Sequence, residues 1–326
     1  IKKEKVSIHI NVTESEMMKG ACDMDEMQLE KLRGRAKILT NITYVLSLIS
    51  LPFLCYIFYL SFQDSTDAFW LILVKSIVVG AVCAVGVLAI LWWILVNGTY
   101  RKFDKNFRNK YVLSLIGNIP GFSKLQYNQD DGFLWEEIRD SGVVNCGHRK
   151  YYKKEDLLLG QYQGIYFKLS DVTTRRPKVS DERNKVEEIF SGQVMCVYQF
   201  DDRKSSKGHI QIFEKKFLSD LRGWKAEHKI EVENAAFQDR FYVYADDPHN
   251  AYYILTPQKM EKIMEFVDAV GVQVSMAFQD QRLYIAVKRH SMFNPVIDEP
   301  VSEQTKMILE DISILQKAFA LLVAIS

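Results

Sequence analysis

Two long apolar stretches constrain this chain more than any other feature of its sequence. They cover residues 38–62 and 69–96. A helix needs roughly 20 apolar residues to cross the ~30 Å hydrocarbon layer of a bilayer, at about 1.5 Å rise per residue, and each stretch is long enough. The segment from Ser76 to Val96 has no polar face that would suit the surface of a soluble domain. We therefore predict a transmembrane hairpin over residues 38–97.

Charged residues around the two spans predict the orientation of the hairpin. Basic residues concentrate in 31–37, before the first span, and in 101–110, after the second. The connecting segment carries Asp64 and Asp67 and has no Lys or Arg. Because basic flanks stay in the cytoplasm, the loop is expected outside and both termini inside.

One charged side chain, Lys75, lies inside a predicted span. An ionisable group within a membrane is a functional candidate. Lys75 is only about one and a half turns from the outer edge, so its long stem can carry the ammonium to the interface. We favour that interpretation over transport. The alternative is an oligomeric ion pathway lined by Thr43, Ser47 and Lys75.

Small and hydroxylated residues recur along one side of each span. Such faces let two membrane helices approach closely, either within one chain or between copies in a homo-oligomer, and the sequence leaves both open. The residues are Thr40, Thr43, Ser47 and Ser50 in the first span and Ser76, Gly80 and Ala84 in the second.

The polar remainder of the chain shows no sign of nucleic-acid or metal binding. The 42 basic and 41 acidic residues of the whole chain nearly balance, so no nucleic-acid partner is predicted. The five cysteines form no Cys-x-x-Cys pair, and Cys146 with His148 supplies only two close ligands. We predict no metal, no disulfide framework and no cofactor.

Periodicity outside the spans predicts four regions. Residues 1–37 read as a partly helical cytosolic leader, 98–122 as a helical stalk and 123–326 as an α+β domain with a mainly antiparallel sheet and packed helices. Thr256 followed by Pro257 predicts the start of a helix that Gly271 ends. An excursion is expected over 173–185, and strands are expected over 161–169, 193–200, 209–213, 228–233, 240–244, 251–255, 272–278 and 283–287.

No local motif identifies an enzyme. Gly-x-Ser-x-Gly, His-Glu-x-x-His, Walker and kinase signatures are absent from the sequence. The densest group of potential catalytic residues is Asp246, Asp247 and His249, which we interpret first as a turn because Asp, Pro and Asn favour turns. A membrane-anchored hydrolase using these residues is the alternative.

Several short motifs, taken in order, resemble the bacterial membrane proteins grouped as domain of unknown function 3137. The resemblance implies a bacterial inner-membrane protein with two spans and a cytosolic α+β domain, and it implies no reaction. Our leading hypothesis is therefore a membrane-tethered module that binds or scaffolds a protein or lipid partner. The motifs include Ser141-Gly142, Glu155-Asp-x-x-x-Gly160, Phe190-Ser-Gly192, Phe213-Glu-Lys-Lys-Phe217, Val232-Glu-Asn234, Phe237-x-x-x-Phe-x-Val-Tyr244, Ala251-Tyr-Tyr-Ile-Leu-Thr-Pro257 and Leu283-Tyr-Ile-Ala286.

Overall fold

A computed structural model describes residues 26–63, 69–178, 185–198, 209–215, 228–279 and 281–325. The chain divides into two compact units. One contains the described residues up to Ser114 together with Val296–Ser302, and the other is Leu115–Pro295 with Glu303–Ser326.

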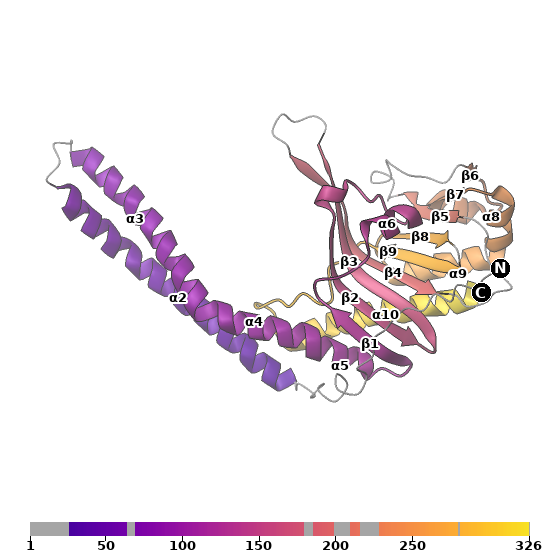
Figure 1. Cartoon of the computed structure of the whole chain (residues 1–326), viewed down its shortest axis with the longest axis horizontal. Helices are drawn as coiled ribbons and strands as arrows, with labels where there is room; N and C mark the ends of the chain where they lie inside the picture. Colours follow the sequence, from indigo (N-terminus) through magenta and orange to yellow (C-terminus); the bar gives the residue numbers. More distant parts are fainter. Residues whose placement is uncertain are drawn as a thin grey trace, which may run out of the picture. The chain divides into compact units, whose positions relative to one another are not determined.

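Long helices build the first unit, as Figure 1 shows in indigo and purple. They are apolar over the predicted spans, and each continues beyond its span as the sequence periodicity predicts. Two short π-helical segments interrupt the second helical run, which otherwise continues to Gly117. The elements are α2 (Glu26–Phe62), α3 (Phe69–Leu91), η1 (Trp92–Val96), α4 (Asn97–Asn106), η2 (Phe107–Val112) and α5 (Leu113–Gly117).

The small-residue faces of α2 and α3 pack against each other within the chain. Thr43 on α2 and Ser76, Gly80 and Ala84 on α3 are buried. A Cβ atom added at Gly80 would lie 2.6 Å from the Sγ of Cys55, so the two backbones are already in close contact there. These faces therefore serve the pairing of the two helices in one chain.

The outward surface of the same pair is apolar. Leu48 on α2 is 72% exposed, and Trp70 and Val82 on α3 are 75% and 68% exposed. Both helical runs, Glu26–Phe62 and Phe69–Gly117, are long and apolar enough to cross a membrane. Their most apolar windows are almost entirely unburied. This is the surface expected of helices whose solvent is lipid.

A nine-stranded antiparallel sheet forms the second unit, in the order β1-β2-β3-β4-β9-β8-β5-β7-β6. The fold class predicted from the sequence is thus confirmed. The strands are β1 (Phe122–Asn128), β2 (Lys153–Tyr162), β3 (Ile165–Pro177), β4 (Val186–Tyr198), β5 (His209–Glu214), β6 (His228–Ile230), β7 (Phe241–Ala245), β8 (Val274–Gln279) and β9 (Arg282–Val287).

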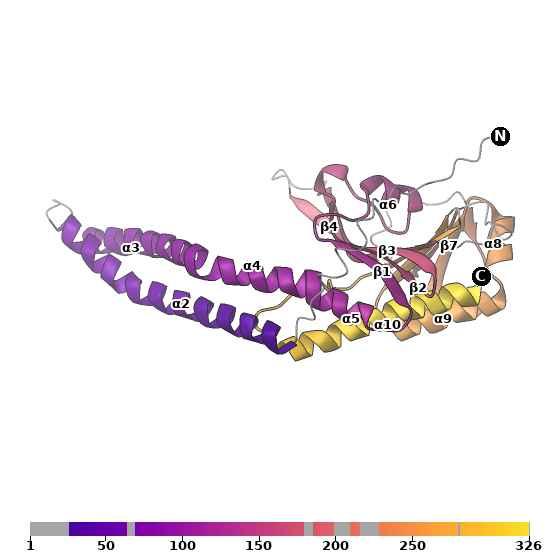
Figure 2. The ribbon, with the colours of Figure 1, turned by 60° about the horizontal axis from the view of Figure 1, so that its bottom comes forward.

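Helices cover both faces of this sheet (Figure 2). On one face, the ring of Phe319 in α10 packs on Phe167 of β3 at 5.4 Å between centroids. On the other, Ile138 of α6 joins a buried cluster with Phe133 and Tyr284. The helices of this unit are α6 (Trp135–Ser141), η3 (Arg149–Tyr151), α7 (Ala235–Arg240), α8 (Pro248–Ile254), α9 (Pro257–Val270) and α10 (Val301–Ile325), of which α10 begins in the first unit.

Three local predictions were wrong. The strand expected over 161–169 is two strands, because Gln163 and Gly164, both with positive φ, turn the chain between β2 and β3. The first part of the excursion expected over 173–185 is strand: Arg175 and Arg176 pair with Glu188 and Glu187 of β4.

The strand expected over 251–255 is instead the second half of α8. Its apolar and aromatic residues satisfy both strand and helix patterns, and the Asp247 cap with Pro248 at the first helical position decides for helix. The composition of residues 201–208 predicts a hairpin turn, and this segment lies outside the described residues.

Candidate functional site

The residues singled out as a possible hydrolase site form the start of α8. Asp247 is its N-cap, and Oδ1 of Asp247 accepts a hydrogen bond from the backbone N–H of His249 at 2.9 Å. Asp246, Asp247 and His249 are all exposed. A capping carboxylate satisfies a backbone donor that a helix start leaves unpaired, so Asp247 has a structural task there.

Two other histidines, His209 and His148, lie elsewhere in the unit. The Nε2 atom of buried His209 is 2.6 Å from the carbonyl oxygen of Ser141. His148 lies in the loop before β2, and Nδ1 of His148 accepts a hydrogen bond from the N–H of Lys150. Within the described part of the chain, no group of three His, Cys, Asp or Glu side chains could hold a metal ion.

Two polar residues of the hairpin bond to backbone carbonyls within the helix pair. The hydroxyl of Thr43 donates to the carbonyl of Leu39 in its own helix, and that of Ser47 donates to the carbonyl of Ala84 across the helix pair. Lys75 is exposed near the start of α3. Thr43 and Ser47 thus contribute to helix packing, on a different side from the exposed Lys75.

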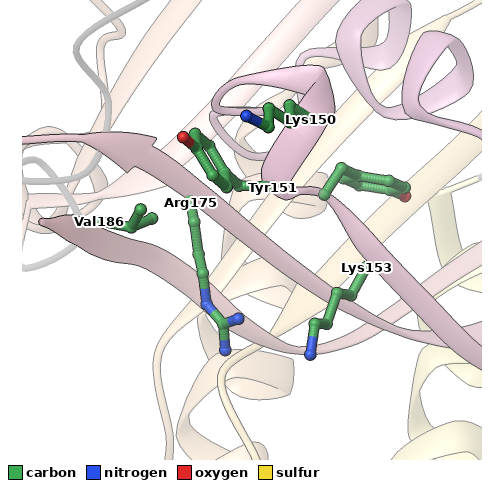
Figure 3. A pocket seen from close by; sticks show the side chains of 6 residues that line it. Lys150, Tyr151, Lys153, Arg175 and Val186 are labelled. Carbon is green, nitrogen blue, oxygen red and sulfur yellow. The ribbon is translucent and has the colours of Figure 1, made fainter. Parts of the chain in front are cut away.

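A cavity of about 250 Å³ lies at the end of the sheet where η3, β2, β3 and β4 meet. Its charged lining residues are all basic, and two tyrosines accompany them (Figure 3). We call it the basic cavity. It is lined by Lys150, Tyr151, Tyr152, Lys153, Arg175 and Val186.

The loop before β2 is fixed to strand β3 beside this cavity. The backbone N–H of His148 donates to the carbonyl of Arg175 at 2.8 Å. Gly147 has a φ of +60°, and a Cβ atom there would lie 2.4 Å from the same carbonyl oxygen. The Asn145 side chain accepts from the N–H of Gly147 at 3.0 Å. Glycine is required because the backbones approach so closely and because φ is positive.

The floor and the rim of the basic cavity differ in polarity. The hydroxyl of Tyr152 donates to the carbonyl of Phe133 at 2.9 Å, and burial raises the pKa of Tyr152, so this hydroxyl stays protonated. Lys150 and Lys153 are exposed at the rim. The guanidinium of Arg175 contacts Glu188 at 3.2 Å. Three cationic side chains and one neighbouring carboxylate leave this site with an excess of positive charge.

A second polar feature lies in the sheet, at a bulge in β2. Asp156 is fully buried with a φ of +58°, and it accepts hydrogen bonds from the hydroxyls of Tyr127 and Ser291. Asp171 of β3 lies close to it, and the Oδ2 atom of Asp171 is shielded from solvent without a hydrogen-bond partner. Burial, followed by the nearby charges of Asp156 and Glu155, raises the pKa of Asp171 well above its usual value.

Sequence reasoning missed both features. For the basic cavity a signal was present, because residues 149–154 read Arg-Lys-Tyr-Tyr-Lys-Lys, a basic and aromatic run. For the carboxyl pair there was none, since Asp156 and Asp171 come from adjacent strands whose register the sequence does not give.

A comparison with family models finds a match to part of the chain. Residues 188–325 match the family described as protein of unknown function (DUF3137). This part of the chain is therefore similar to that family. No curated protein and no solved structure matches the chain. The matched range includes Asp246 to His249, whereas the hairpin and all six cavity residues precede it.

Proposed function

We propose that this protein is a membrane-anchored binding module, in which α2 and α3 cross the bilayer and the nine-stranded unit binds a partner. The observation that carries the proposal is the apolar outer surface of the α2–α3 pair. Leaving one large apolar side chain in water rather than burying it costs about 1.5–3 kcal/mol. Side chains as exposed as Leu48, Trp70 and Val82 recur along both helices, and lipid removes this cost.

The charge pattern supports an orientation with both ends of the hairpin in the cytoplasm. Arg101, Lys102 and Lys105 are exposed on α4, directly after the second span. Basic residues at this position remain on the cytoplasmic side and attract anionic headgroups. The membrane in this proposal is the inner membrane of a bacterium, and the nine-stranded unit lies in the cytoplasm.

A binding role is supported by the chemistry of the nine-stranded unit. The basic cavity presents lysine and arginine cations together with tyrosine side chains, a combination that suits the binding of an anion. Asp247, two residues before His249, caps a helix. We therefore assign partner binding to the basic cavity. Hydrolysis at Asp246 to His249 is the alternative function, and the capping role of Asp247 argues against it.

Protease protection tests the anchoring and the orientation. Sealed right-side-out spheroplasts and inverted vesicles that contain the full chain are treated with protease, and fragments of the nine-stranded unit are followed by immunoblot. We expect protection in spheroplasts and digestion in inverted vesicles. Digestion of the unit in intact spheroplasts, or release of the chain from membranes by alkaline carbonate, would overturn the proposal.

A further inference from the structure

We propose that the basic cavity binds a phosphate group carried as a phosphomonoester. The inference rests on the proposed function, since it names the ligand class of the site assigned there. Lys153 and Arg175 are the groups that hold the phosphate, and Lys150 and the tyrosines complete its surroundings.

The size of the cavity favours a small charged group. Pockets for drug-sized ligands measure roughly 300–1,000 Å³ and are mostly apolar. The basic cavity has about 250 Å³ and three cationic lining residues, with Val186 as its one aliphatic residue. It suits a compact anion, while the remainder of a larger ligand stays outside.

The charge of the cavity matches a dianion. Lys150, Lys153 and Arg175 contribute three positive charges, and Glu188 beside Arg175 contributes one negative charge. A phosphomonoester carries a charge of about −1.5 to −2 at pH 7. A single carboxylate would leave about one positive charge uncompensated.

Two of the cations come from neighbouring strands and extend to the same side. Lys153 is opposite Thr173 in the β2–β3 register, and Arg175 is two residues further along β3, so the two are diagonal neighbours. Figure 3 shows the side chains of Lys153 and Arg175 extending in the same direction from their strands. Because β2 and β3 are hydrogen-bonded to each other, the spacing between the backbone positions of Lys153 and Arg175 is fixed.

Arg175 keeps donors for a ligand despite its ion pair. Nη2 of Arg175 contacts Glu188 at 3.2 Å. A guanidinium has five N–H donors in a planar fork, which matches two phosphate oxygens, whereas a lysine ammonium acts as a point charge. The pair with Glu188 is itself exposed, so a bound dianion competes with it at a modest free-energy cost.

The cavity is formed before a ligand arrives. Gly147 and His148 hold the loop against the Arg175 carbonyl, and the Tyr152 hydroxyl is anchored on Phe133. A site whose backbone is already fixed does not lose conformational entropy in the loop when it binds.

Calorimetry on the full chain in phosphatidylcholine nanodiscs tests the inference, with glycerol 3-phosphate as the probe. We expect saturable binding, and about ten- to hundred-fold weaker binding for both Arg175→Gln and Lys153→Gln, as for the loss of hydrogen bonds to a charged group. Arg176→Gln is the matched control, because Arg176 pairs with Glu187 and does not line the cavity.

Glu188→Gln is expected to increase the affinity for phosphate, a change that a misfolded variant would not show. Removing the carboxylate that competes for Arg175 is expected to tighten phosphate binding by up to about five-fold, the range of an exposed ion pair. Nanodiscs that contain phosphatidic acid identify the source of the phosphate. If phosphatidic acid weakens the binding of glycerol 3-phosphate, and Arg175→Gln removes this competition, the phosphate belongs to a lipid headgroup. If glycerol 3-phosphate binds equally well in both kinds of nanodisc, the ligand is a soluble phosphomonoester.

Three results would overturn the inference: no binding, equal weakening by Arg175→Gln and Arg176→Gln, or equal affinity for succinate. If the nine-stranded unit is nevertheless protected in spheroplasts, the proposed anchoring stands and only the ligand class is wrong. If the chain leaves the membrane while phosphate still binds at the basic cavity, the anchoring is wrong and the ligand class stands.

Discussion

Replacement of Asp171 by Asn tests whether the carboxyl pair in the sheet holds a proton. Asp171 faces buried Asp156, and its Oδ2 atom lacks a partner away from solvent. Two ionised carboxylates in contact repel each other, so the folded state favours one neutral member, and the raised pKa identifies Asp171 as that member. Asn has nearly the shape of a protonated Asp and carries no charge at any pH.

The pH dependence follows from linkage between proton binding and folding. In the unfolded chain Asp171 loses its proton near its ordinary pKa of about 3.9, whereas in the folded state it keeps the proton to higher pH. Its contribution to stability is therefore complete below about pH 4 and declines by about 1.4 kcal/mol per pH unit until the folded pKa is passed. Asp171→Asn lacks this decline, so its free energy of unfolding should exceed that of the wild type by a margin that grows with pH.

Pulse proteolysis in urea at pH 5, 6, 7 and 8, on full-length protein in detergent, measures this margin. Asp311, whose pKa burial raises to about 6, titrates in both proteins and cancels in the difference. The matched control is Asp156→Asn, because Asn also tolerates the positive φ at this bulge. It should destabilise by about 1–3 kcal/mol, since the donors of Tyr127 and Ser291 lose a charged acceptor. A margin that is negative at pH 7, or that does not change with pH, would show that Asp171 is ionised in the folded protein.

Three further substitutions have defined outcomes. Gly80→Ala should overpack the helix pair, lowering its free energy of unfolding by about 1–3 kcal/mol and therefore its thermal midpoint in detergent. Gly86→Ala, at a position with open space around it, should leave the midpoint unchanged. Glu30→Gln should reduce the protection of the Val301 amide from hydrogen exchange, because that amide donates to Glu30 at 3.0 Å. Arg33, together with this contact, lowers the pKa of Glu30, so the protection factor, which is corrected for intrinsic exchange, should also fall as the pH drops through that lowered pKa. A protection factor that does not change with pH would contradict this. Asp247→Ala should lower the unfolding free energy by about 1 kcal/mol through loss of a cap, and loss of a detected hydrolase activity without loss of fold would contradict the structural role.

The sequence predicted best those elements whose signals are local. The apolar spans, the helix capped by Thr256 and ended by Gly271, and the hairpin of β8 and β9 were all found from patterns within a few residues. The edge strand β1 and the first part of β2 were not predicted, because their residues show no clear alternation of apolar and polar side chains. The helix α8 was read as a strand because its residues suit both periods.

The site required contacts that no local pattern encodes. Arg175 reaches the basic cavity because β3 extends to Pro177 in register with β4, where the sequence indicated an irregular excursion. Gly147 matters only because the Arg175 carbonyl lies against it. Conversely, Asp247 and His249 were candidate catalytic residues because they lie close together in the sequence, and the structure shows that this closeness belongs to a helix cap.

The family match also has a structural meaning. The strands within or entering residues 188–325, from β4 onward, are neighbours in the sheet, in the order β4-β9-β8-β5-β7-β6, and the two long helices α9 and α10 lie in the same range. The matched range is thus a contiguous part of the sheet with its helical cover. Strands β1 to β3 extend this part at one edge, and they bring Lys153 and Arg175 with them. Because the basic cavity is built chiefly from that extension and lies outside the matched range, the family match does not determine its ligand, and the side chains of this chain do.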